Sequence, residues 1–126
     1  MEKDELDALT GKVIGLAIEV HRQLGPGLLE TAYQQCLAYE FSHADIPFEM
    51  EKPIPVRYKN TRIDCAFRAD FVIDNRIILE LKAVDKILPI HEAQLLTYFK
   101  LTKLHLGFII NFNVRVLKNG IKRIIL

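Results

Sequence analysis

The stretch from residue 67 to residue 82 constrains the fold more than any other part of the chain. Two apolar runs meet at Asp74-Asn75, and both carry charges in β-branched and aromatic surroundings: Asp70 in the first run, Glu80 and Lys82 in the second. Apolar runs separated by such a turn signal are typical of two antiparallel strands. Charges in strands of this kind normally lie at the ends or on a solvated face, so their placement here needs a reason.

The register of this hairpin decides what the charges can do. If the turn centres on Asn75, the numbers of facing residues add to a constant, so Asp70 lies across from Glu80 and Arg68 across from Lys82. Facing carboxylates repel unless a proton or a cation lies between them, and an oxygen-only pair suits a hard ion such as Mg²⁺. A two-residue loop would instead put the acids on opposite faces. The alternative interpretation is an edge hairpin with a charged outer face.

Length and composition indicate one soluble globular domain. The 126 residues suffice for a hydrophobic core of their own, and 50% apolar with 26% charged residues is an ordinary balance. No apolar run approaches the roughly 20 residues of a membrane span, and the acidic start is unlike a leader, which predicts a cytoplasmic protein. Cys36 and Cys65 occupy apolar-patterned positions without zinc or redox spacing, so we expect reduced core thiols.

The net charge of +1 hides an uneven distribution of charge along the chain. Ten acids stand against three bases up to Glu51, whereas no acid follows residue 92. The bases of that last segment are Lys100, Lys103, Arg115, Lys118, Lys122 and Arg123. This asymmetry suggests a basic side that meets a polyanion, although exposed lysines also serve solubility.

The first half of the chain alternates between helical and extended patterns. Apolar residues three and four apart predict a helix over residues 4–24, ended by Gly25-Pro26-Gly27, and a second helix from about 28 to 42. Period-two alternation with three prolines predicts an edge strand over 46–58. Lys59-Asn60 then turns the chain into a long strand. Its expected apolar face consists of Ile63, Cys65, Phe67, Ala69, Phe71 and Ile73.

The second half predicts a crossover. Pro89 can open a helix that runs from about 90 to 103, and the almost uniformly apolar residues 106–112 are typical of a central strand. Strand, helix and strand in this order imply a right-handed parallel connection. Asn119-Gly120 between two apolar runs predicts a C-terminal hairpin of two further strands.

Several polar residues on the helices have two interpretations. Glu30 in the first turn of the second helix either complements the helix dipole or serves as a ligand. His21, near the end of the first helix, fits a structural role better than a catalytic one. Gln94 and Tyr98 are four residues apart and project from one helix face.

Four motifs occur in an order that resembles one enzyme family: Gly27-Leu-Leu-Glu30 opening a helix, Asp70 on a strand, Glu80-Leu-Lys82 on its partner, and Gln94-x-x-x-Tyr98 on the next helix. This order is similar to that of the PD-(D/E)xK nuclease superfamily, in particular its RecB-like and lambda-exonuclease-like branches. The segment from Val20 to Tyr33 further resembles the small GxxExxY proteins assigned to that superfamily. The resemblance runs from about residue 13 to residue 112. One departure is Ala69, which stands where the family name has proline.

The resemblance implies an α/β protein with a restriction-endonuclease-like three-layer α/β/α fold over residues 1–126. The mixed central sheet would have the core order α-β-β-β-α-β, to which this chain adds an N-terminal helix and a C-terminal hairpin.

The resemblance also implies a divalent-metal-dependent nuclease, with DNA as the expected polymer. Asp70, Glu80 and the main-chain carbonyl of Leu81 would bind Mg²⁺ or Mn²⁺. Residues with catalytic roles would be Lys82, Glu30, Gln94 and Tyr98, and residues that hold nucleic acid would be Arg62, Arg68, Lys100 and Lys103.

Two other functions stay open at this point. A catalytically inactive module could keep the nuclease fold and bind nucleic acid or regulate a partner, and a plain structural or partner-binding domain would need neither metal nor nucleic acid. A domain of this size offers limited surface to a nucleic-acid duplex, which suggests a homodimer or a partner protein.

Overall fold

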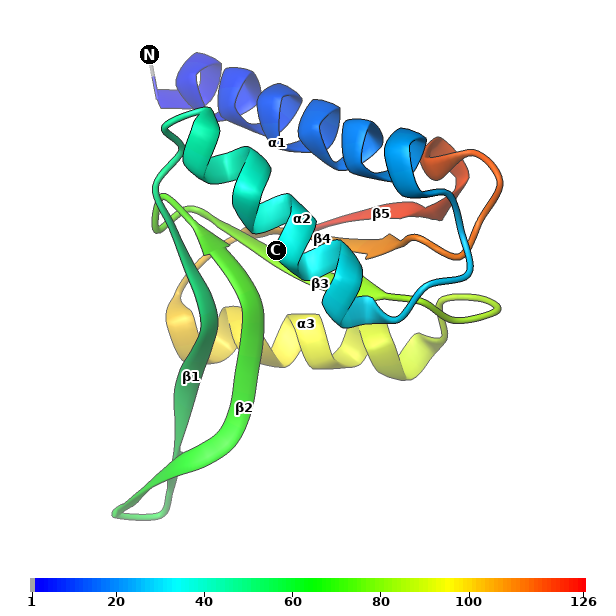
Figure 1. Ribbon diagram of the computed structural model, residues 1–126. Helices are drawn as coiled ribbons and strands as arrows, with labels where there is room; N and C mark the ends of the chain where they lie inside the picture. Colours follow the sequence, from blue (N-terminus) through cyan, green and yellow to red (C-terminus); the bar gives the residue numbers. More distant parts are fainter. Residues whose placement is uncertain (1) are drawn as a thin grey trace.

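The computed structural model describes residues 2–126, apart from the side chains of Cys65 and Ala66. Its centre is a five-stranded mixed sheet with the strand order β1-β2-β3-β4-β5 (Figure 1). Two helices, α1 and α2, cover one face of the sheet, and α3 covers the other. The predicted three-layer α/β/α architecture is confirmed.

The elements follow the predicted order, and most boundaries lie within three residues of those expected. They are α1 Glu2–Leu24, α2 Glu30–His43, β1 Phe48–Tyr58, β2 Thr61–Ile73, β3 Ile77–Lys82, α3 Pro89–Thr102, β4 Leu106–Asn111, the 3₁₀ helix η1 Leu117–Gly120, and β5 Ile121–Ile125. Pro89 opens α3 as expected, because its missing N–H costs nothing in a first helical turn.

The sheet begins with an antiparallel meander of β1, β2 and β3, and α3 then carries the chain across to β4, which pairs parallel to β3. The β2–β3 pairs are Phe71 with Leu79, Val72 with Ile78, and Ile73 with Ile77. Their numbers add to one constant, so the turn centres on Asn75 and the two-residue loop is excluded. The ladder ends at Phe71 and Leu79, so neither of the expected pairs beyond it forms: Asp70 does not pair with Glu80, nor Arg68 with Lys82.

Each face of the sheet has its own hydrophobic core. Under α1 and α2, buried side chains such as Val13, Ala17 and Leu37 pack against odd-numbered residues of β3. Under α3, Leu95 and Phe99 pack against the even-numbered side. Strand β3 is buried on both faces, which explains its almost uninterrupted apolar sequence.

The predicted face of β2 is wrong, because the strand changes sides. Phe71 and Ile73 lie in the core under α1 and α2, whereas Phe67 and Ala69 belong to the core under α3. The β1–β2 pairing skips Asp70 and its neighbour Glu51, whose backbone has a left-handed φ of 52°. Side chains on either side of this break face opposite cores, which sequence alternation alone does not reveal.

The C-terminal hairpin is also a wrong prediction. Asn119-Gly120 ends the 3₁₀ helix η1, and the single strand β5 then pairs antiparallel with β4. A Cβ atom at Gly120 would lie 2.2 Å from the carbonyl oxygen of Asn111. The glycine is therefore required by close packing of η1 on the end of β4.

Two other features bear on the sequence-based expectations. Cys36 is a free, half-buried thiol beside the core under α1 and α2, whereas the side chain of Cys65 lies outside the described part. Within residues 2–126, no helix combines the length and the apolar character that a membrane crossing demands.

Candidate active site

Asp70 lies where the β2–β3 ladder ends. Instead of a backbone pair, its Oδ2 atom accepts a hydrogen bond of 2.7 Å from the backbone N–H of Leu81. This bond ties the carboxylate of one strand to the residue directly after Glu80 on the next strand. The acids at 70 and 80 therefore lie at the same end of the β2–β3 pair, although the ladder stops one position before the two residues would pair directly.

Glu80 is a buried acid without a hydrogen-bond partner on Oε1 among the described residues. Its position on β3 faces the side of the sheet that α3 covers, and only 7% of the residue is exposed. Burial, and after it the neighbouring Asp70 carboxylate, raise the pKa of Glu80 to about 8, although Lys82 acts in the opposite direction. Buried carboxylate oxygens are normally paired, so this oxygen has room for a proton, a cation or a bound water as its partner.

The pKa of Asp70 is raised as well, and burial is the largest cause. The Leu81 N–H opposes this shift, whereas the carboxylates of Glu30 and Glu51 add to it. Four acids thus act on one small region, with Lys82 as the cation that lowers the pKa of both Asp70 and Glu80. The negative potential that results favours binding of a positive ion.

A pocket of about 190 Å³ opens beside Asp70. Its lining residues come from α2, β1, β2 and β3, and they are Glu30, Thr31, Gln34, Glu51, Asp70 and Leu81. The amide of Gln34, which is 6% exposed, donates a long hydrogen bond of 3.5 Å to the backbone carbonyl of Asp70. The sequence did not predict Gln34 and Glu51 as site residues. Gln34 lies in an ordinary helix pattern, and Glu51 comes close to Asp70 only through the irregular β1–β2 pairing.

The turn between α1 and α2 delivers Glu30 to this pocket. Gly25 and Gly27 have positive φ angles of 70° and 99°, which let the chain reverse within a few residues. The hydroxyl of Tyr33 donates to the carbonyl of Gly25 at 2.7 Å and accepts from the N–H of Leu28 at 3.1 Å. The tyrosine thereby locks the turn that places Glu30, and this explains the spacing of glycine, glutamate and tyrosine.

Lys82 ends β3, where it pairs with Asn111 of β4. Asn111 is 2% exposed, and its side-chain amide holds both backbone groups of Val84 at 3.1 and 2.9 Å and accepts from the N–H of Asn113 at 3.2 Å. The connection after Lys82 is therefore clamped to the end of β4. Sequence patterning gave no signal for Asn111, which lies in an apolar run.

The two polar residues expected on α3 have different environments in the structure: Tyr98 is buried, whereas Gln94 is exposed. The Tyr98 hydroxyl donates to the carbonyl of Arg68 at 3.3 Å, and its ring meets Phe67 edge-on at 5.1 Å. Burial, followed by the charges of Glu80 and Asp70, raises the pKa of Tyr98 to about 12. Tyr98 thus fastens β2 above α3 close to the two acids, whereas Gln94 is exposed.

The basic residues expected to hold nucleic acid lie on two elements. Arg62 and Arg68 are exposed on β2, and Lys100 and Lys103 are exposed on α3 or at its end. The bases of the C-terminal segment do not form a single basic side. Lys118 lies on η1, which contacts α1, whereas Lys122 pairs with Glu92 of α3 at 3.4 Å.

His21 has a structural role that fits its sequence position. Its Nε2 atom lies 2.7 Å from the carbonyl oxygen of Val114, so the ring joins the end of α1 to the loop after β4.

A comparison with family models identifies the chain's relatives. The model described as the PD-(D/E)XK nuclease superfamily matches residues 7–124, nearly the whole chain. The chain belongs to this superfamily. Neither the curated proteins nor the solved structures gave a match. Membership agrees with the restriction-endonuclease-like layers described above and points to nucleic acid as the substrate class of the superfamily.

Within residues 2–126, the candidate site does not contain a ready cluster of metal ligands. Among the described residues, no three His, Cys, Asp or Glu side chains are grouped closely enough to hold an ion. The two central acids still fit one, because Oε1 of Glu80 is buried without a partner and lies in the field of Asp70. Two carboxylates with a main-chain carbonyl form an all-oxygen donor set of the type that Mg²⁺ prefers.

Proposed function

We propose that this protein is a divalent-metal-dependent nuclease that hydrolyses phosphodiester bonds of DNA. The observation that supports this most strongly is the buried, unpartnered Oε1 atom of Glu80 beside the carboxylate of Asp70. Keeping two acids together in a buried place costs stability unless their charge is compensated. A fold that keeps them has a use for a cation at this position.

Asp70, Glu80 and the main-chain carbonyl of Leu81 would hold Mg²⁺ or Mn²⁺. Such an ion supplies charge neutralisation at the phosphate and makes a nucleophile available at neutral pH. The Leu81 N–H occupies one oxygen of Asp70, which orients the other oxygen of that carboxylate. The chain's own contribution is thus a fixed pair of oxygens at the end of two neighbouring strands.

Lys82 is the residue that we assign to the attacking water. As an ammonium it would orient the water through hydrogen bonds, and as an amine it would accept the water's proton. Its backbone position is fixed by β4 on one side and by the clamp of Asn111 on Val84 on the other. A loosely held lysine would lose much of the benefit of proximity.

The remaining residues fit supporting roles. Glu30 lines the pocket beside Asp70 and could contact a bound ion through water. Tyr98 holds the strand of Asp70 through the carbonyl of Arg68. Gln94, which is exposed on α3, would contact the substrate backbone. Arg62 and Arg68, with Lys100 and Lys103, would bind phosphates without reading bases.

The lock that Tyr33 provides on the glycine turn supports placing the chain near the GxxExxY proteins within the superfamily. We also infer a cytoplasmic protein that acts as a dimer or with a partner, since one domain of this size offers little surface to a duplex.

The decisive experiment compares wild type, Lys82→Ala and the control Lys86→Ala, which removes an exposed lysine four residues further on. Each protein is incubated with labelled single- and double-stranded DNA and RNA in Mg²⁺, Mn²⁺ or EDTA. We expect metal-dependent cleavage by wild type and by Lys86→Ala, and a loss of at least a hundredfold in Lys82→Ala.

Equal digestion by wild type and Lys82→Ala would refute the catalytic assignment. Binding without cleavage in every metal, unchanged by Glu80→Ala, would instead identify an inactive nucleic-acid-binding module.

A further inference from the structure

The outer parts of β1 and β2 form a two-stranded ribbon that leaves the body of the protein. Strand β2 pairs with β3 only over residues 71–73, so the preceding residues of β2 have no strand on their other side. Ile54 and Phe67 anchor the inner part of the ribbon over α3. Beyond this anchor the pairing shifts register, and residues 56–64, which we call the arm, project past α3 (Figure 1).

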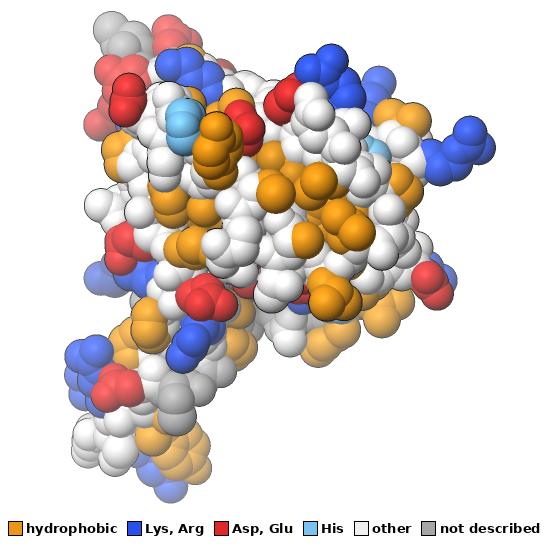
Figure 2. All heavy atoms as spheres, viewed as in Figure 1, with side chains coloured by type: hydrophobic (Ala, Val, Ile, Leu, Met, Phe, Trp, Pro, Cys, Tyr) orange, Lys and Arg blue, Asp and Glu red, His pale blue; other side chains and the backbone are white. Residues whose placement is uncertain are grey.

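The arm has two different faces. Cross-strand partners share a face, so Arg57 lies with Arg62 on one side, whereas Val56 lies with Ile63 on the other. Tyr58 follows Val56 on the second face, where 63% of Tyr58 and 38% of Ile63 are exposed. Basic and apolar side chains are visible together on this projection (Figure 2). One ribbon therefore offers charge on one side and apolar surface on the other.

The charges of the arm are not balanced within the arm. Arg57 and Arg62 face each other, and like charges in directly opposite positions destabilise a strand pair. Asp64 bonds to Arg62, but among the described residues no ion pair forms with Arg57. Lys59 adds a third positive charge at the tip. A bound polyanion would remove this repulsion from a ribbon that has little other support.

We propose that the arm enters the major groove of B-form duplex DNA while the acids at its root face the phosphate to be cleaved. This inference rests on the proposed nuclease function and specifies its substrate as duplex DNA. The major groove, about 12 Å wide and 8.5 Å deep, admits a two-stranded ribbon, whereas the major groove of duplex RNA is too narrow for side chains to read. Both faces of the arm carry exposed side chains, so both can contact groove walls.

The length of the ribbon sets the spacing between the two contacts. Tyr58, near the tip, lies seven residues after Glu51 at the root, which corresponds to about 23 Å of extended strand. At about 3.4 Å per base pair this is about seven base pairs. The arm would therefore contact the duplex about half a helical turn or more away from the cleaved bond.

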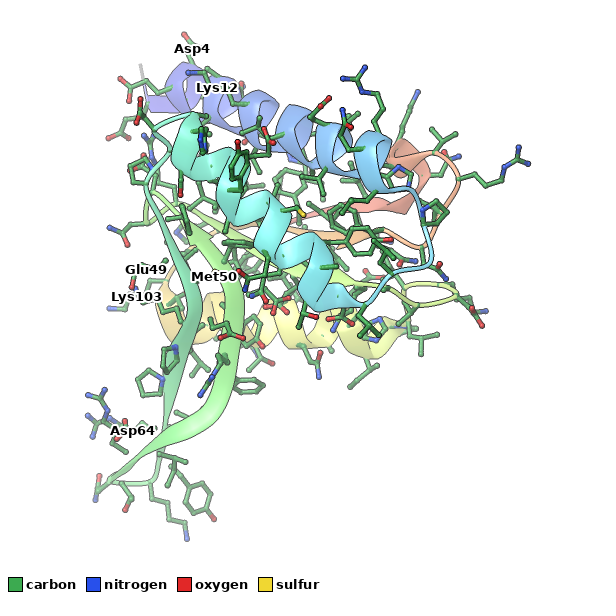
Figure 3. All side chains as sticks on the ribbon, in the orientation of Figure 1. Asp4, Lys12, Glu49, Met50, Asp64 and Lys103 are labelled. Carbon is green, nitrogen blue, oxygen red and sulfur yellow. The ribbon has the colours of Figure 1, made fainter. Side chains whose placement is uncertain are left out.

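The test measures binding, which separates it from catalysis. Arg57→Ser/Arg62→Ser is combined with Lys82→Ala so that the substrates stay intact, and binding to a labelled 20-base-pair DNA duplex, the same RNA duplex and one DNA strand is followed by fluorescence anisotropy. The control Lys3→Ser/Lys12→Ser removes two exposed charges from α1, and Figure 3 shows Lys12 far from Asp64 of the arm.

We expect the arm variant to bind duplex DNA at least tenfold more weakly, with the slope of log K against log salt reduced by about two. Binding to the single strand and to duplex RNA should change less than threefold, and the control should match the parent. The melting temperature of the arm variant should change little, because losing the like-charge pair offsets losing the exposed ion pair of Arg62 with Asp64.

Unchanged duplex affinity would overturn the proposal, as would an equal loss for the single strand. A change of oligomeric state in sedimentation would assign the arm to a subunit contact and would also overturn it. Cleavage of duplex DNA by wild type, lost in Lys82→Ala, would leave the nuclease function standing in all these cases. Absence of cleavage combined with the expected binding pattern would overturn the nuclease function alone.

Discussion

Replacing Glu80 with glutamine should remove a strong pH dependence from the stability of the metal-free protein. Burial and the Asp70 carboxylate raise the pKa of Glu80 from 4.5 to about 8, so the folded protein holds a proton there over a range where the unfolded chain has released it. The native state binds more protons in this window, and its stability therefore falls as pH rises from 4.5 to about 8. This loss of stability is complete once the pH exceeds the pKa of Glu80 in the folded protein.

The size of this effect follows from the same pKa. Each pH unit inside the window contributes about 1.36 kcal/mol, so the whole window corresponds to about 5 kcal/mol. Between pH 5 and pH 8, wild type should lose about 4 kcal/mol more than Glu80→Gln, whose neutral amide cannot ionise. Domains of this size are stable by about 5–15 kcal/mol, so the difference is a large fraction of the total.

The assay is urea unfolding in EDTA at pH 5, 6, 7 and 8, followed by circular dichroism because the chain contains no tryptophan. Glu2→Gln, a change at an exposed acid of α1, is the matched control and should follow wild type. Adding Mg²⁺ at 100 times its dissociation constant should stabilise wild type by about 2.7 kcal/mol and leave Glu80→Gln unchanged. The stabilisation by Mg²⁺ should grow with pH, since the ion competes with the proton for the Glu80 carboxylate.

Two results would refute this reasoning. If the free energies of wild type and Glu80→Gln fall in parallel with pH, the carboxyl does not hold a proton at neutral pH. If Mg²⁺ stabilises both proteins equally, the ion binds elsewhere.

Three further substitutions test the framework of the site. Asn111→Ala should lower the free energy of unfolding by about 2–3 kcal/mol, because it frees the buried backbone of Val84, and chemical denaturation with a nuclease assay should show activity falling as well. Tyr33→Phe should cost about 1–2 kcal/mol by leaving the glycine turn without its hydroxyl, which thermal unfolding would detect. Gly120→Ala should cost more than about 1 kcal/mol, since its Cβ would overlap a backbone carbonyl, and an unchanged melting temperature would contradict this account.

The sequence predicted correctly the features that a single local interaction determines. The turn centred on Asn75 fixed the β2–β3 register, and the uniform apolar run of β4 indicated its central place in the sheet. Pro89 marked the start of α3 because few other positions tolerate a proline. These signals are short-range consequences of backbone geometry, so they survive without knowledge of the neighbours.

The sequence-based predictions failed where a segment that is distant in the sequence determines the role of a residue. Asn119-Gly120 has the composition of a hairpin turn, but the close approach of Asn111 gives this glycine a packing role at the end of η1. Gln34 and Asn111 look like ordinary polar residues in helix and strand patterns, and only the fold turns their amides toward backbone near the site. Charge counts along the chain failed for the same reason: Lys118 lies on η1 beside α1, whereas Lys122 of β5 pairs with Glu92 of α3.

The break in the β1–β2 ladder connects the site with the arm. Glu51 has a left-handed backbone, which costs a residue with a side chain roughly 1 kcal/mol or more, and opposite it Asp70 makes no ladder pair. Freed from a regular β position, the Asp70 carboxylate bonds to the backbone of Leu81. Beyond the break the strands change faces and run over α3 as a ribbon. The arm itself begins at a second irregularity, the register shift between Ile54 and Val56. Because the free position of the acid and the change of faces lie at the same break, a change that restored regular pairing there would disturb the acid and the root of the ribbon together.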